Sequence, residues 1–182
     1  NAPGWWGMFI TMMGDATAFA ALIFGVFFYW TARPDFPPAG AAHAEALRLG
    51  LGTAALLAAW AVTVTARETN RRGMGALTRL CLAAGPVLAL GGAGLVAWSL
   101  LASGMDPTAH VYPAMMWALT VWIGVHALAG SIMQLYCLAG CWFGKLTPDY
   151  DADLWNVTLF WHFAALMIGV AAATVGILPR LL

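Results

Sequence analysis

Long apolar stretches alternate with short polar ones along the whole chain. The polar stretches hold turn formers and charges, such as TARPDFPPAG after the first apolar stretch and RETNRRGMG after the second. Several apolar stretches exceed the roughly 20 residues that a helix needs to cross a bilayer. A helix in lipid satisfies its own backbone polar groups, so each stretch predicts a spanning helix. The predicted helices cover about 5–30, 46–66, 79–102, 112–139 and 154–178.

This pattern predicts an all-α fold: a polytopic membrane helical bundle of five transmembrane helices, forming a single domain over residues 1–182. The connections are short, which predicts that helices consecutive in the sequence are antiparallel neighbours. Small residues such as Gly91, Gly92 and Gly94 would allow two helices to approach closely.

Arginine and lysine in the connections predict the orientation, because cytoplasmic loops carry an excess of these residues. The second and fourth connections together carry Arg67, Arg71, Arg72, Arg79 and Lys145. The opposite side carries Arg33, Arg48 and Arg180. The difference predicts a cytoplasmic N-terminus and a periplasmic C-terminus.

Composition supports the membrane assignment and narrows the function. The chain is 62% hydrophobic and 9% charged, whereas soluble domains carry about a quarter charged residues. The net charge is zero and there is no basic run, so nucleic acid is not an expected partner. Cys81, Cys137 and Cys141 lack a CxxC spacing and are expected to be buried apolar residues. A start at Asn1, without methionine or a signal pattern, suggests a processed end or a segment of a longer polypeptide.

Asp15 is the acidic residue placed deepest in the first predicted helix. It lies about ten residues in, roughly 15 Å along the helix, which is near the middle of a bilayer. An isolated carboxylate is costly there, so the group would be protonated or paired. Two interpretations stay open: a protonatable carboxyl or contact to a partner chain, and an aspartate that only fixes helix packing.

His126 and His162 lie within the fourth and fifth predicted helices. Two histidines on facing helices could ligate one b-type haem, but these would differ in depth by about 7 Å. No further ligands cluster near them in the sequence. We therefore expect polar contacts rather than cofactor ligation. No nucleophile–base pair, phosphate loop or dinucleotide motif occurs, so no catalytic residue is expected on this chain.

Three stretches resemble segments of cytochrome c oxidase subunit III, the third large subunit of haem–copper oxidases. They occur in that family's order: Pro3–Trp30 with its membrane acid, GVHALAG at Gly124–Gly130, and LFWHFAAL at Leu159–Leu166. The family's usual acid is glutamate, whereas this chain has Asp15. The five helices match the last five of the seven-helix form. The opening PGWWGM is similar to the subunit III portion of bacterial oxidases in which subunits I and III are fused.

The resemblance implies an accessory, non-redox subunit of a proton-pumping cytochrome c oxidase in the inner membrane of a bacterial cell. Such a subunit packs against catalytic subunit I, together with subunit II, and supports assembly and sustained proton uptake. It implies no cofactor on this chain, a structural phospholipid beside it, and haem and copper in the partner subunit. Asp15, His126 and His162 are then expected to make lipid or subunit contacts.

Three alternatives remain open at this point. A subunit III-like protein of nitric oxide reductase shares the expected fold and can carry a membrane aspartate. A small b-type cytochrome would use His126 and His162 as haem ligands. A transporter subunit would carry a small solute without a partner chain.

Overall fold

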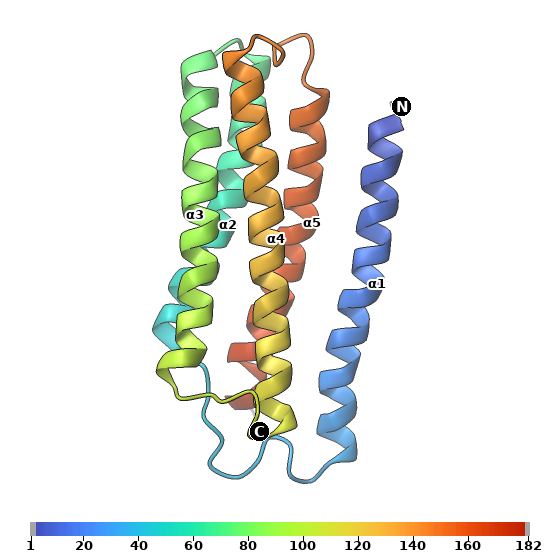
Figure 1. The fold of residues 1–182 in the computed structure, drawn as a ribbon, viewed down its shortest axis with the longest axis vertical. Helices are drawn as coiled ribbons and strands as arrows, with labels where there is room; N and C mark the ends of the chain where they lie inside the picture. Colours follow the sequence, from blue (N-terminus) through green and yellow to red (C-terminus); the bar gives the residue numbers. More distant parts are fainter. Residues whose placement is uncertain (1–2, 181–182) are drawn as a thin grey trace.

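The computed structural model of the protein describes residues 3–180, so Asn1 lies outside the described residues. This part of the chain contains five helices long and apolar enough to cross a membrane. They are α1 (Pro3–Ala32), α2 (Ala46–Arg71), α3 (Gly75–Ala102), α4 (Val111–Trp142) and α5 (Ala152–Gly176), and a 3-10 turn, η1 (Leu178–Arg180), follows α5. The all-α class and the five spans are thereby confirmed (Figure 1).

The second connection is much shorter than predicted. α2 continues past residue 66 to Arg71, and α3 begins at Gly75 rather than at residue 79. Gly73 adopts a φ of 71° in the turn between them, a conformation that glycine adopts at little cost. Thr69 and Thr78 share a hydrogen bond of 3.0 Å across this turn. The charged residues of this connection led us to end the predicted helices early. α2 and α3 continue past those positions, where polar side chains such as Thr69 and Thr78 bond each other.

The last helix ends earlier than predicted, at Gly176 rather than at residue 178. Pro179 has no backbone N–H to continue the helix, and the chain forms the 3-10 turn η1 instead. Arg180 then reaches back and donates a hydrogen bond of 2.7 Å to the carbonyl of Ala44, before α2. This bond fixes the end of α5 against the connection between α1 and α2.

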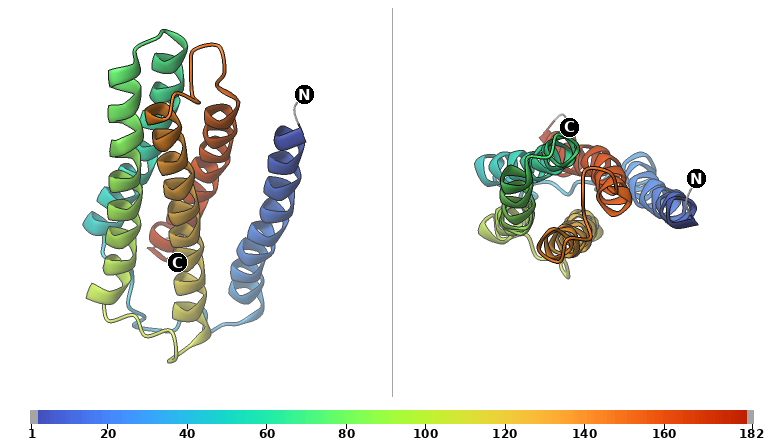
Figure 2. Two further views of the ribbon diagram at one scale, coloured as in Figure 1. Left: turned by 45° about the horizontal axis from the view of Figure 1, so that its top comes forward. Right: turned by 90° about the horizontal axis from the view of Figure 1, so that it is seen from above.

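Four of the helices form a bundle and the fifth lies outside it. α2 packs against α3 and α5, while α4 completes the square by packing against α3 and α5. α1 packs against α5 and α4, on the outer side of the bundle (Figure 2). The prediction that consecutive helices are neighbours is therefore wrong for α1 and α2. Residues 33–45 between them run across the end of the bundle (Figure 1), and their length makes this crossing possible.

The helices α2 and α3 approach each other closely at Gly52 and Gly92. A Cβ on either residue would lie 2.7 Å from the other's carbonyl oxygen, so only glycine permits this separation. Gly92 therefore has the predicted role. Gly91 and Gly94 do not, because their Cβ positions face open space.

Candidate functional site

Asp15 faces the bundle because of its position on α1. The buried residues of α1 are Met12, Phe19 and Val26, which are spaced seven apart. Asp15 is three residues after Met12 and four before Phe19, so it lies on the same face of the helix. This face contacts α4 and α5. The carboxyl is thus directed into the protein, with its side chain 24% exposed.

His126 of α4 is the partner of Asp15. The imidazole Nε2 is 2.5 Å from the carboxyl Oδ2 of Asp15. The other ring nitrogen, Nδ1, is 2.7 Å from the backbone carbonyl oxygen of Trp122. A carbonyl can only accept, so Nδ1 carries a proton and the bond to Asp15 uses Nε2. Both polar groups near the middle of these spans are therefore satisfied by each other and by α4.

The geometry leaves one proton to be shared between Asp15 and His126. Either the carboxyl is protonated and donates to a neutral imidazole, or an imidazolium donates to a carboxylate. The pair has no net charge in either form, which makes it tolerable at this depth in lipid. The site can therefore hold one proton and transfer it along this hydrogen bond between Asp15 on α1 and His126 on α4.

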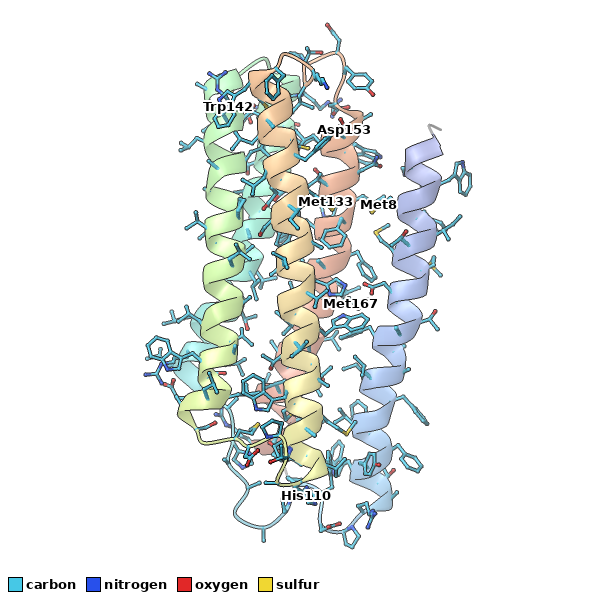
Figure 3. All side chains as sticks on the ribbon, viewed as in Figure 1. Met8, His110, Met133, Trp142, Asp153 and Met167 are labelled. Carbon is cyan, nitrogen blue, oxygen red and sulfur yellow. The ribbon has the colours of Figure 1, made fainter. Side chains whose placement is uncertain are left out.

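Aromatic side chains enclose the imidazole of His126. Trp122 stacks on it with ring centroids 4.9 Å apart, and Phe160 of α5 lies parallel at 6.1 Å. Phe19 of α1 contacts Trp122 at 6.0 Å. The side chain of His126 is only 9% exposed. Figure 3 shows Met8, about two turns of α1 before Asp15, directed toward the bundle. This apolar surround excludes water from the imidazole and strengthens the bond to Asp15.

His162 is not part of this pair. Its Nδ1 accepts a hydrogen bond of 2.8 Å from the indole Nε1 of Trp60 on α2. The imidazole is exposed and lies on the outer seam between α2 and α5. An indole N–H can only donate, so Nδ1 carries no proton and the remaining ring proton is on Nε2. Asp15, His126 and His162 were expected to share a role. Instead, Asp15 and His126 form a pair inside the protein, and His162 lies apart on its outer surface.

The two histidines do not face each other. His126 contacts α1 and Phe160, whereas His162 contacts Trp60 of α2. Across the described residues, no group of three or more His, Cys, Asp and Glu side chains is arranged to hold a metal ion. The b-type cytochrome alternative needs both histidines on one haem, and these positions give it no support.

Sequence reasoning missed Trp60 as a partner for His162. The sequence did contain a signal. Tryptophans of membrane proteins gather at the interfaces, whereas Trp60 lies well inside α2, where its N–H needs a partner. It also missed the role of Gly85, whose Cβ would lie within the side chain of Gln134. Gln134 is fully buried and donates a hydrogen bond of 2.5 Å to Thr63. Three helices of the bundle thus meet at one polar contact, for which Gly85 makes room.

Polar contacts near the ends of the helices close both ends of the bundle. At one end Arg67 pairs with Asp151 at 3.2 Å and lies over the ring of Trp155 at 3.8 Å. At the other, the hydrogen bond from His110 lowers the pKa of Asp35 below its usual 3.8. These contacts anchor connections and contain no reactive group.

The sequence matches no protein family model and shows no significant match to a curated protein. The family resemblance therefore depends on the three motif stretches of the sequence.

Proposed function

We propose that this chain is an accessory, non-redox subunit of a proton-pumping cytochrome c oxidase, in the manner of subunit III. The observation that carries the proposal is the hydrogen bond between Asp15 and His126. These residues come from two of the three resembling stretches, and they form one site near the middle of the spans. The haem and copper would belong to the partner, catalytic subunit I, with subunit II beside it.

In this role the Asp15–His126 pair gives the complex a protonatable group that places no net charge in the membrane interior. The Trp122 and Phe160 rings keep the imidazole in place, so the shared proton stays available to a neighbouring chain through repeated turnovers. This accounts for a subunit that sustains proton uptake without redox chemistry of its own. The chain would lie in the bacterial inner membrane with its N-terminus in the cytoplasm, and phospholipid would fill the grooves beside α1.

The test starts from the tagged full-length chain, purified in mild detergent from its native membrane. We expect subunit I to purify with it, identified by mass and by a haem spectrum. Asp15→Asn should leave this assembly intact, because the amide can still bond His126. The enzyme's working lifetime during turnover should shorten, because the shared proton is lost. An unchanged lifetime and proton uptake at all pH values would mean that Asp15 only packs helices.

Nitric oxide reductase is the second candidate partner, because a subunit III-like protein of that complex can carry a membrane aspartate, as this chain does with Asp15. The same purification separates the two candidates. A partner that reduces nitric oxide and not oxygen would favour the second. Solute uptake into vesicles that contain this chain alone would favour a transporter instead.

A further inference from the structure

The outer seam between α2 and α5 contains a groove of about 430 Å³. Its lining includes the small residues Gly50 and Ala54 on α2 and Gly169 and Ala173 on α5, together with Arg180 of η1. A Cβ added at Gly50 or Gly169 would have no neighbour within 4 Å. These glycines are therefore not required for packing inside the chain, whereas small residues of this kind let another helix approach closely.

The groove leads toward His162. Successive turns of α5 place Leu166 and then His162 beyond Gly169 on the same face, and successive turns of α2 place Trp60 beyond Leu57. Leu57 and Gly169 line the groove, and the bond between Trp60 and His162 joins the helices next to it. The seam defined by Gly50, Ala54, Gly169, Trp60 and His162 is thus continuous.

His162 presents one fixed hydrogen-bond donor on this seam. Because Nδ1 accepts from Trp60, Nε2 carries the ring proton, and it makes no hydrogen bond within residues 3–180. His162 is eight residues after the start of the predicted span at residue 154, about 12 Å along α5. That depth lies within the hydrocarbon region, where a polar group without a partner is costly because no water replaces it.

The donor distinguishes between the possible occupants of the groove. A phospholipid could place its headgroup at Arg180, but the acyl chain that would fill the rest of the groove has no atom to accept a hydrogen bond from Nε2. A helix can do both, because its side chains fill the groove while an oxygen accepts from Nε2. The acceptor is a carboxylate, an amide or hydroxyl oxygen, or a carbonyl freed by proline, all of which occur in membrane helices.

We propose that the α2–α5 seam docks one transmembrane helix of a partner chain, which presents an acceptor oxygen to Nε2 of His162. Trp60 is a positioning residue, because its N–H selects the tautomer that donates outward. Under the function proposed above the partner is the catalytic subunit, and the inference rests on that function for the partner's identity. It does not involve the Asp15–His126 pair, which contacts the other side of α5.

The experiment measures how much haem-containing partner purifies with each variant of the tagged full-length chain. His162→Phe keeps a ring but removes the donor, and Gly169→Leu fills the groove. His162→Phe should lower partner recovery about tenfold, the size expected when one hydrogen bond is lost at an interface. Gly169→Leu should lower it by a similar factor, because its side chain occupies the space of the partner helix. His162→Gln should retain most of the recovery, because its amide N–H can donate in place of Nε2–H. Trp60→Phe should give an intermediate loss.

Gly91→Leu is the matched control for the groove variant. Gly91 is an exposed glycine on α3 whose Cβ would also meet nothing within 4 Å. The Gly91→Leu variant should recover as much partner as the unchanged chain does. Thermal unfolding of each purified variant shows whether a lost partner reflects a lost fold, and the variants should unfold at the same temperature as Gly91→Leu.

Benzophenone-phenylalanine at Leu166, which is 65% exposed, identifies the occupant directly. We expect a crosslink to a membrane span of the catalytic subunit, and His162→Phe should abolish it. A crosslink to a second copy of this chain, or to lipid alone, would overturn the docking proposal. Normal partner recovery with both His162→Phe and Gly169→Leu would also overturn it, although the proposed function would stand. If no oxidase subunit purifies with the unchanged chain, the proposed function fails. In that case the docking proposal stands only if Leu166 crosslinks to a membrane span of some other chain and His162→Phe abolishes that crosslink.

Discussion

The bundle of α2 to α5 and the outer helix α1 are both strongly apolar, yet they are held in different ways. In the most apolar stretch of α1, 11% of the residues are buried, against 33–44% in the other four helices. The bundle helices touch backbone to backbone at Gly52 and Gly92. In α1, the Cβ positions of Gly7 and Gly14 face open space, and that of Gly25 lies 3.0 Å from the flexible side chain of Met115 rather than from a backbone atom. Among the described residues, the packing of α1 depends instead on a narrow apolar stripe and on one hydrogen bond between Asp15 and His126.

The difference shows what holds helices together in lipid. Apolar surface gains little by leaving a hydrocarbon solvent, so close packing and hydrogen bonds decide which helices associate. The bundle has both, and α1 has mainly the second. We therefore expect α1 to separate from the bundle under conditions in which the bundle remains folded.

The largest effect should come from the backbone contact between Gly52 and Gly92. Gly92→Val would place a side chain against the carbonyl of Gly52 and force α2 and α3 apart. Overpacking of this kind costs about 3 kcal/mol. The measurement is the free energy of unfolding in mixed micelles. Gly91→Val makes the same chemical change next door, where the Cβ faces open space, and should cost far less. Equal losses in the two variants would contradict the close approach.

The next effect tests the buried polar contact of the bundle. Thr63→Val leaves the amide of Gln134 without its acceptor and should cost about 1 to 2 kcal/mol. Adding Gln134→Leu should recover most of this stability, because no polar group then lacks a partner. Thr53→Val is the control, since the hydroxyl of Thr53 bonds only within its own helix, to Leu49. If the double variant is less stable than Thr63→Val alone, the contact is not the source of the loss.

A smaller effect should appear when α1 loses its hydrogen bond. Asp15→Leu removes the bond to His126 and should weaken the attachment of α1 by about 1 kcal/mol. Spin labels at Gly7 on α1 and Ile132 on α4 should show a longer, broader distance distribution. The unfolding of the bundle should not change. Asp15→Asn can still bond His126 and should keep the distribution narrow. A narrow distribution with leucine would show that the apolar stripe is sufficient.

The smallest effect concerns Asp35, which follows α1 and bonds His110 before α4. The pKa of Asp35 is lowered below 3.8, mainly by this hydrogen bond. The contact therefore stabilises the fold fully above pH 3.8, and this contribution is lost as the pH falls through the lowered pKa. Asp35→Asn should reduce the melting temperature slightly at neutral pH and have no effect near about pH 2. A difference that persists in acid would rule out the ionised carboxyl as its cause.

Individual residues of the candidate site could be found from the sequence, but their pairing could not. Asp15 and His126 stand out as polar groups inside apolar spans. Nothing local shows that they meet, because the expected neighbour of α1 was α2, and α1 lies instead against α4 and α5. His162 was grouped with them, although its bond to Trp60 places it on the opposite side of α5. The depth argument against a shared haem used only helix rise, and it agrees with the separate surroundings of the two histidines.

The sequence by itself determined that the chain forms five membrane-spanning helices, and which polar residues lie deep within them. Both follow from local composition, because a long apolar run in lipid must satisfy its own backbone. Only the tertiary structure decided which face of each helix is inward, which helix α1 lies against, and which ring nitrogens are free. The physical reason is that these helices are apolar on nearly all sides. An apolar side chain is about equally stable against lipid and against protein. Glycine contacts and a few hydrogen bonds therefore decided which face of each helix is inward.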